Sequence, residues 1–257
     1  LAETELALAG ELVDANGSPV TENFAFPTEI GPAIGAGVKV GPLLQFEIPT
    51  VINLNALAVD GIAAGNLTPD DQMPGVPGEY VTTDGADAEV ITFVEFPAGW
   101  LTMGVNSDDG FRSEAGPIEY PDDRVLLGEF DGGRGASDTT FDIYVQSAGV
   151  YPVRTIWMNG SGDASIEIFT VAADGTKVLL NDTANGGLKT YRTGVAPEPV
   201  EPSPDFFISI QLDGGAVRIT WTEAGLVLQQ SADLGTWTDV ANATSPYTPP
   251  ADSAPGL

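Results

Sequence analysis

Short runs in which apolar and polar residues alternate recur along most of the chain, and this period of two predicts β-strands. The two clearest runs are residues 89–96 and 100–105, and Pro97-Ala98-Gly99 between them predicts a hairpin turn. Further strands are predicted at residues 124–130, 139–146, 149–158, 164–171 and 177–180. Many short strands separated by turn residues are typical of an antiparallel sandwich or a closed barrel.

The N-terminal third of the chain alternates less regularly. Residues 1–20 predict a leading strand followed by a turn at Asn16-Gly17. Residues 35–59 predict two or three short strands, and residues 60–87 predict a long polar loop that prolines hold in place. The alternation breaks again at residues 113–117.

A change in composition divides the chain near its C-terminal end. Residues 195–204 alternate proline with acidic residues, which predicts a stiff, extended linker. We therefore expect a domain at 1–194, the linker at 195–204 and a small β module at 205–257. Strands in that module are predicted at residues 206–212, 216–222 and 226–230.

The charge of the chain narrows the classes of partner. The 257 residues contain 37 Asp and Glu against 9 Lys and Arg, which gives a formal net charge of −28. Such a balance argues against binding nucleic acid or an anionic membrane surface through a basic patch. No apolar run approaches the ~20 residues that span a bilayer, so membrane insertion is not expected. The acidic, turn-rich composition fits a secreted, extracellular or cell-surface protein.

Cysteine and histidine are both absent from the sequence. Their absence excludes disulfide bonds, thiol nucleophiles, zinc sites of the usual kind and histidine-based catalytic triads. Oxygen ligands remain, and these suit Ca²⁺. A glycosidase with paired carboxylates would need two acids on opposite sides of a cleft, which a sequence cannot place. We therefore expect no enzymatic activity.

The best candidate site is the stretch Val105-Asn106-Ser107-Asp108-Asp109-Gly110-Phe111-Arg112. Its two adjacent carboxylates lie between an apolar run and a glycine, so a strand is predicted to end there in a loop rich in oxygen atoms. A plain Asp-Gly turn is the alternative interpretation. Asp70-Asp71 and Asp122-Asp123 are predicted to be solvated turn residues. Four tryptophans in or beside strand patterns are predicted to pack in the core: Trp100, Trp157, Trp221 and Trp237.

The sequence around this stretch resembles the protective-antigen-type domain family, which includes yeast flocculins and adhesins. The resemblance rests on residues 104–112, 149–154 and 164–169, and it covers roughly residues 51–193. Residues 72–78, 128–135 and 176–182 are similar to modules of very large secreted proteins of environmental bacteria. The resemblance implies an all-β, lectin-like antiparallel β-sandwich of jelly-roll type.

The resemblance also implies a calcium site. Adhesins of the family hold Ca²⁺ with two successive aspartates that a cis peptide joins, and Asp108 and Asp109 match that pair. Asn159 is the first expected further ligand, with Asn106 and Asp131 next. Arg112, at the end of the same stretch, completes the set of residues expected to contact a ligand.

The C-terminal residues are similar to a small β module found in such secreted proteins. The similarity lies in residues 226–234, 236–240 and 245–248. A further strand would follow Leu257 in that pattern, so we expect a meander or fibronectin-like module that is truncated.

Two functions follow as expectations. The first is a non-catalytic adhesion module that binds carbohydrate or a cell-surface glycan with the help of calcium. The second is a structural subunit whose strand edges and extended segments pair with neighbouring copies in a filament or surface layer. Five Asn-X-Ser/Thr triplets match the glycosylation acceptor pattern only weakly: Asn16, Asn66, Asn159, Asn181 and Asn242.

Overall fold

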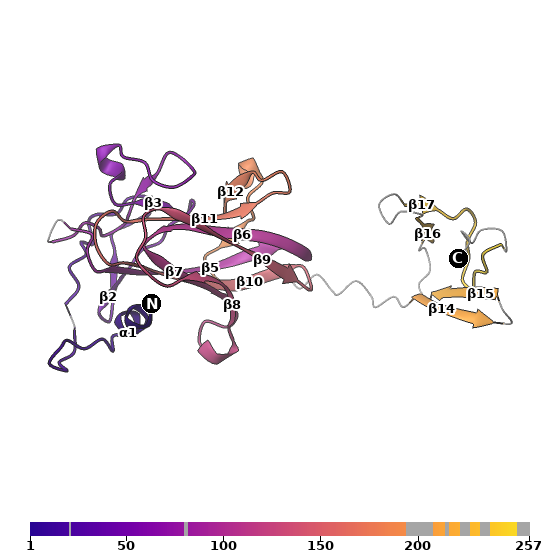
Figure 1. Cartoon of the computed structure of the whole chain (residues 1–257), viewed down its shortest axis with the longest axis horizontal. Helices are drawn as coiled ribbons and strands as arrows, with labels where there is room; N and C mark the ends of the chain where they lie inside the picture. Colours follow the sequence, from indigo (N-terminus) through magenta and orange to yellow (C-terminus); the bar gives the residue numbers. More distant parts are fainter. Residues whose placement is uncertain are drawn as a thin grey trace. The chain divides into compact units, whose positions relative to one another are not determined.

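The alternating runs of the sequence form the strands of two sheets (Figure 1), and their buried side chains form one core cluster. The structure is a computed structural model, and it describes residues 1–20, 22–79, 82–193, 208–213, 216–221, 227–231 and 237–250. The chain divides into two units, Leu1–Pro197 and Glu198–Leu257. The boundary between them falls within the predicted linker 195–204, and the linker itself lies outside the described residues.

One sheet of the first unit has the strand order β13-β5-β10-β7-β8 and is antiparallel throughout. Its strands are β5 (Ala86–Phe96), β7 (Gly110–Ala115), β8 (Val125–Phe130), β10 (Gly149–Asn159) and β13 (Thr190–Tyr191). The other sheet has the order β4-β3-β11-β6-β9, and β12 pairs with β11 beside this path. Its strands are β3 (Asn53–Asn55), β4 (Asp71–Gln72), β6 (Gly99–Asp108), β9 (Ser137–Val145), β11 (Ser165–Val171) and β12 (Lys177–Leu179).

The core lies between these two sheets, as the period-2 pattern requires. One sheet contributes Val94, Phe96, Phe111, Val153 and Trp157, and the other contributes Leu54, Met103, Val105, Ile166 and Ile168, all of them buried. The sandwich predicted from the sequence is therefore confirmed, and the alternative of a closed barrel is not observed in the described residues.

Smaller elements lie outside the two sheets. They are the helix α1 (Ala2–Ala9), the hairpin strands β1 (Val38–Val40) and β2 (Leu43–Gln45), and the 3₁₀ turns η1 (Ala58–Asp60), η2 (Pro121–Asp123) and η3 (Thr183–Asn185). Strands β1, β2 and β3 are the short strands predicted for residues 35–59. Among the described residues, no helix is long and apolar enough to cross a membrane.

The predicted leading strand is wrong, because Ala2–Ala9 form α1. Alanine, leucine and glutamate are strong helix formers, and Glu3 and Glu5 in the first turn interact favourably with the helix dipole. Gly10 ends the helix with φ of 73°, a conformation that glycine adopts without a steric cost. The predicted turn does form, since Asp14 and Ser18 close it through a backbone hydrogen bond.

The break in alternation at residues 113–117 coincides with an irregular strand end. Strand β7 continues to Ala115, and its pairing with β8 shifts register between Ser113 and Glu114. A β-bulge therefore accommodates the first residues of the irregular stretch, and the strand ends two residues later.

The tryptophans divide into two groups. Trp157 is buried in the core as predicted, with 1% of its surface exposed. The same prediction is wrong for Trp100 and Trp237, which are 74% and 52% exposed. The core is complete without them, and Trp221 is half-buried.

The second unit contains two small antiparallel hairpins in its described part. One pairs β14 (Ile208–Asp213) with β15 (Ala216–Trp221), and the other pairs β16 (Gln229–Gln230) with β17 (Thr238–Asp239). Tyr247 adds an isolated bridge to Ile219 of β15. Residues 251–257, where the truncation is expected, lie outside the described residues.

Candidate functional site

The Asp108–Asp109 pair lies where the chain passes from one sheet to the other. Strand β6 ends at Asp108 in one sheet, and β7 begins at Gly110 in the other. The connection from β10 to β11 crosses between the sheets at the same end, because Asp108 pairs with Ser165 and Gly110 pairs with Met158. Two strand-to-strand crossings thus converge on the acidic pair.

Backbone contacts fix the position of the two aspartates. The Trp157 indole Nε1 donates to the Asp108 carbonyl oxygen at 3.0 Å, and the Ser107 hydroxyl donates to the Asp109 carbonyl oxygen at 2.6 Å. The Asp109 N–H donates to the Met158 carbonyl oxygen at 3.1 Å. The peptide bond between Asp108 and Asp109 is cis, as the family resemblance implied.

The Asp109 carboxylate is held by backbone donors from two loops. Its Oδ1 accepts the Arg134 N–H at 2.6 Å, and its Oδ2 accepts the Gly160 N–H at 2.8 Å. Each carboxylate oxygen has lone pairs for about two acceptor interactions, so both oxygens keep capacity for a cation. The side chain is oriented and buried, with 8% of the residue exposed.

Asn159 ends β10 next to Gly160, whose N–H binds the Asp109 carboxylate. Its amide nitrogen donates to the Thr83 carbonyl oxygen at 2.8 Å, while its Oδ1 is buried and has no hydrogen-bond partner. The next residue, Gly160, is the one that binds Asp109. A buried amide oxygen without a partner is costly in a folded protein unless a ligand satisfies it.

The pKa of Asp108 is raised from its ordinary value of 3.8 to about 6. Burial is the largest cause, and the negative charges of Asp109 and Asp163 add to it. Within the described residues, no lysine or arginine forms an ion pair with either member of the pair. A bound cation would remove this unfavourable electrostatic energy.

These observations fit a calcium ion. Carboxylates of Asp108 and Asp109 and the free Oδ1 of Asn159 are hard oxygen donors, which Ca²⁺ prefers. The set holds only two acidic side chains, and no group of three or more Asp or Glu residues arranged for a metal occurs in the described part of the chain. Main-chain carbonyls, solvent or a ligand would have to complete the ~6–8 ligands that Ca²⁺ takes.

Two residues near the pair were missed by the sequence interpretation. Arg134 lies in a Gly-Gly-Arg-Gly stretch, and its guanidinium donates to the Ser107 carbonyl oxygen and hydroxyl at 3.1 and 2.7 Å. It also lies over the Phe130 ring, 4.2 Å from its centroid. Asp163 acts on the Asp108 pKa from the turn before β11. Arginine among glycines was the one available signal.

Asn106 lies on the same side of β6 as Asp108 and belongs to a second polar cluster, formed with Asn66, Asp138 and Glu167. Its amide donates to Asp138 at 2.7 Å, and its Oδ1 is buried without a partner. Asn66 donates to the same Asp138 carboxylate at 2.6 Å and to Glu167 at 3.1 Å. As in Asn159, the amide is used elsewhere and the Oδ1 has no partner, but within the described residues no hydrogen bond joins Asn106 to Asp109 or to its neighbours Arg134 and Gly160.

The loop at residues 61–70 is fastened to this cluster by buried Glu167, which is 1% exposed. The Glu167 carboxylate accepts the backbone N–H groups of Asn66 and Leu67 at 2.9 and 2.7 Å. Gly65 has φ of +75°, and a Cβ there would lie 2.5 Å from the Glu167 carboxyl carbon, so only glycine fits. Asp70 accepts hydrogen bonds from Asn55 and the Ala64 N–H, so the prediction of a merely solvated turn is wrong for it.

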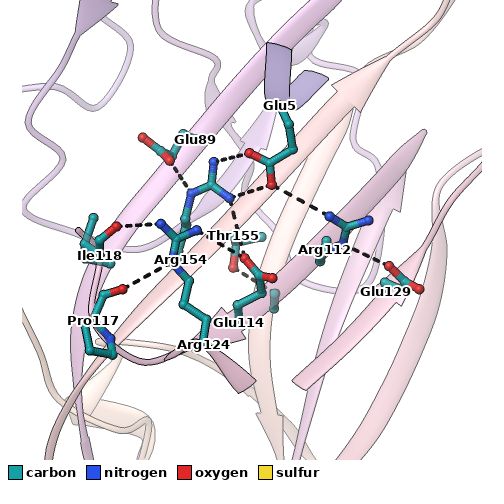
Figure 2. A network of polar contacts seen from close by, with 11 residues as sticks. Glu5, Glu89, Arg112, Glu114, Pro117, Ile118, Arg124, Glu129, Arg154 and Thr155 are labelled. Carbon is teal, nitrogen blue, oxygen red and sulfur yellow. Dashed lines mark hydrogen bonds and ion pairs between the residues drawn. The ribbon is translucent and has the colours of Figure 1, made fainter. Parts of the chain in front are cut away.

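Two of the expected ligand residues have other partners. Asp131 accepts a hydrogen bond from the Leu1 ammonium at 2.9 Å. Arg112 lies on the outer side of β7, where its Nε donates to Glu129 at 3.0 Å and its Nη1 is 3.7 Å from Glu5 (Figure 2). The structure therefore groups Asp108, Asp109 and Asn159, and it places Arg112 and Asp131 in separate ion pairs.

Figure 2 shows the network that contains Arg112, and its centre is the buried Arg154 of β10. Arg154 makes two hydrogen bonds to the Glu5 carboxylate, at 2.8 and 2.7 Å, and a third to Glu89. The Glu114 Oε2 lies 3.5 Å from the Arg154 Nη1. Glu5 belongs to α1, so this network fastens the helix to the sheet.

Searches among known proteins give structural matches only. No family model and no curated protein sequence matches the chain. The PA14 sugar-binding domain of an RTX adhesin matches with a TM-score of 0.37 and 18% identity, over 57% of this chain and 86% of that chain. The chain matches PA14 domains.

A second PA14 match is the domain of the antifreeze protein MpAFP, with a TM-score of 0.34 and 18% identity over 42% of this chain and 52% of that one. The A domain of epithelial adhesin 6 from Candida glabrata, in complex with Galβ1-3GlcNAc, matches with a TM-score of 0.32 and 13% identity over 38% of this chain and 48% of that one. The chain thus spans about half the length of these two structures. The site at Asp108 and Asp109 is described by contacts within this chain alone.

Proposed function

We propose that this chain is a non-catalytic, extracellular adhesion module that binds neutral carbohydrate at a calcium site made by Asp108, Asp109 and Asn159. The observation that carries the proposal is a buried pair of carboxylates without an ion-pairing cation among the described residues, bound through Gly160 to the residue next to Asn159, whose Oδ1 has no partner. Oxygen donors gathered in this way have a chemical use if a hard cation binds among them.

The chain's own residues would divide the work. Asp108 and Asp109 would supply negative charge and direct ligand oxygens, and Asn159 a neutral oxygen. The N–H groups of Arg134 and Gly160 would keep the Asp109 carboxylate oriented. Bound calcium would offer coordination positions to neighbouring hydroxyls of a sugar. The net charge of −28 disfavours anionic ligands, which leaves neutral glycans as the best fit.

The test is glycan binding with and without calcium. We expect the purified chain to bind members of a panel of neutral glycans, including Galβ1-3GlcNAc, in Ca²⁺ and to lose binding in chelator. An Asp108→Asn plus Asp109→Asn variant should not bind in either condition. The matched control changes the exposed pair in η2, Asp122→Asn plus Asp123→Asn, and should bind like the wild type. Equal binding in calcium and chelator would contradict the proposal.

A second function is favoured by one separate observation. In β14, Ile208, Ile210 and Leu212 lie on one side of the strand and are 56%, 66% and 79% exposed. We propose as the alternative a structural subunit in which this apolar row packs against a neighbouring copy in a filament or surface layer. Light scattering and electron microscopy test it. Concentration-dependent assembly that Ile210→Ser abolishes would support it, and a monomer at every concentration would contradict it.

A further inference from the structure

An exposed aromatic pair lies on the outer side of the β6–β9 strand pair. Trp100 and Tyr144 are directly opposite each other in the register, with ring centroids 5.2 Å apart and an angle of 56° between the rings. Their surfaces are 74% and 61% exposed. Aromatic side chains of this size are ordinarily mostly buried, so their exposure requires an explanation.

Packing within the sheet explains only part of this arrangement. A cross-strand aromatic pair stabilises a sheet modestly, and smaller or β-branched residues would serve nearly as well. The contact uses one side of each ring at most and leaves the rest in solvent. The pair contributes little to the core, which is filled by Met103 and Val105 from the opposite side of β6.

Polar groups directly adjoin the two rings. The next register pair on the same side is Thr102 with Asp142, and the Thr102 hydroxyl donates to the Asp142 carboxylate at 2.6 Å. Trp100 and Tyr144 are the only large apolar side chains that β6 and β9 expose, and both strands are fully described. Two rings are far too little apolar area for a stable protein interface, which buries ~800 Å² per partner. They are about the size of one or two sugar rings.

We propose that Trp100 and Tyr144 form a second carbohydrate-binding surface, which stacks against the C–H face of a neutral pyranose in a polysaccharide. Sugars have an apolar face and a polar edge, so they suit aromatic rings bordered by hydrogen-bonding groups. Asp142 is an acceptor for sugar hydroxyls, and Thr102 can donate or accept. The net charge of −28 disfavours acidic polysaccharides.

This surface is separate from the acidic pair and does not rest on calcium. Trp100 and Asp108 are eight residues apart on β6, which corresponds to about 26 Å at ~3.3 Å per residue. No carboxylate of the proposed calcium site is needed for stacking. Failure of one site therefore leaves the other untouched, and the two can be measured independently.

The experiment is retention of the whole chain on insoluble cellulose and chitin, together with retardation in gels that contain soluble neutral β-glucan. All measurements are made in chelator, so that calcium-dependent binding does not contribute. We expect Trp100→Ala to weaken binding at least about tenfold, which is ~1.4 kcal/mol. Tyr144→Ala should weaken it about threefold or more, and Asp108→Asn plus Asp109→Asn should leave it unchanged.

The matched control is Trp237→Ala, which removes another exposed tryptophan, in the second unit. It should bind like the wild type. Thermal melts of Trp100→Ala and Tyr144→Ala should stay close to that of the wild type, because both side chains are exposed. The proposal is overturned if none of the three polysaccharides is bound in chelator, or if binding persists in both Trp100→Ala and Tyr144→Ala.

Discussion

Two groups of acidic residues in the first unit differ in how their charge is compensated. On the outer side of one sheet, the carboxylates of Glu5, Glu89 and Glu114 surround the buried guanidinium of Arg154 (Figure 2). At the end of the sandwich, Asp108 and Asp109 are equally part of buried structure but have no ion-pairing side chain among the described residues.

The pKa shifts record the same difference. The hydrogen bond from Arg154 lowers the pKa of Glu5, whereas burial raises the pKa of Asp108. The first group is satisfied from within the chain and serves to hold α1 on the sheet. The second group has backbone donors but no ion pair among the described residues, and that property favours a candidate binding site over a structural ion pair.

The largest effect is expected at the centre of the compensated group. Arg154→Met should lower the free energy of unfolding by about 3 kcal/mol or more, since it leaves the surrounding carboxylates without their cation. Urea unfolding of the purified variant measures this. Calcium-dependent stabilisation should survive, because Arg154 has no contact with the acidic pair. A loss below about 1 kcal/mol would show that the network contributes little to holding α1 on the sheet.

Removing one donor from the uncompensated group should have a smaller and different effect. Asn159→Ala deletes the unpartnered oxygen, so we expect calcium affinity to fall about tenfold or more. It also deletes the amide that donates to the Thr83 carbonyl oxygen, so the melting temperature in chelator should fall as well. Calorimetric titration with Ca²⁺ gives the affinity. Asn185→Ala, at an exposed asparagine in η3, is the control. An unchanged affinity in Asn159→Ala would remove this residue from the site.

The sequence predicted the sandwich and its acidic pair well because both depend on local signals. Period-2 alternation identified β5, β6, β10 and β11, and the Asp-Asp-Gly stretch identified the end of β6. The leading strand was predicted wrongly even though α1 has local signals of its own, namely strong helix formers and Gly10 at its end. No local pattern shows where the helix packs, because Glu5 is held by Arg154, 149 positions away.

The candidate site was predicted only in part, because some of its expected residues have partners distant in the chain. The resemblance indicated Asp108 and Asp109, and Asn159 was the first expected further ligand; in the structure its neighbour Gly160 binds Asp109. It could not show that Arg112 pairs with Glu129 or that Asp131 pairs with Leu1, because those contacts depend on which side of each strand faces a neighbour. The exposure of Trp100 was missed because strand periodicity does not say whether the outer side of a sheet is covered.

The two groups should also respond oppositely to pH in chelator. The Glu5 pKa is lowered, so its stabilising effect is present above pH 4.5 and is lost as the pH falls below that value. The Asp108 pKa is raised from 3.8 to about 6, so stability is lost as the pH rises across that range. Unfolding midpoints between pH 3 and 8 test this. Glu5→Gln should make the unfolding midpoint less dependent on pH below 4.5, and Asp108→Asn should make it less dependent on pH between 3.8 and about 6. Midpoints that depend on pH as in the wild type after both substitutions would contradict the assignment.

The smallest effect on the free energy of unfolding is expected at an exposed ion pair, which shares with the Arg154 network only the pairing of arginine with glutamate. Arg192 is 70% exposed and contacts Glu47, which is 38% exposed. Arg192→Ala should change the free energy of unfolding by no more than about 0.5 kcal/mol. A loss comparable to that of Arg154→Met would show that burial is not what separates these pairs.

The most direct test of the central claim, that the acidic pair is completed by calcium, is a thermal melt in Ca²⁺ and in chelator. Calcium at about 100 times its Kd should stabilise the wild type by ~2.7 kcal/mol, which is a clear upward shift in Tm. The shift should disappear in Asp108→Asn plus Asp109→Asn and persist in Asp122→Asn plus Asp123→Asn. Identical wild-type melts in Ca²⁺ and chelator would contradict the account and leave the pair as a structural turn.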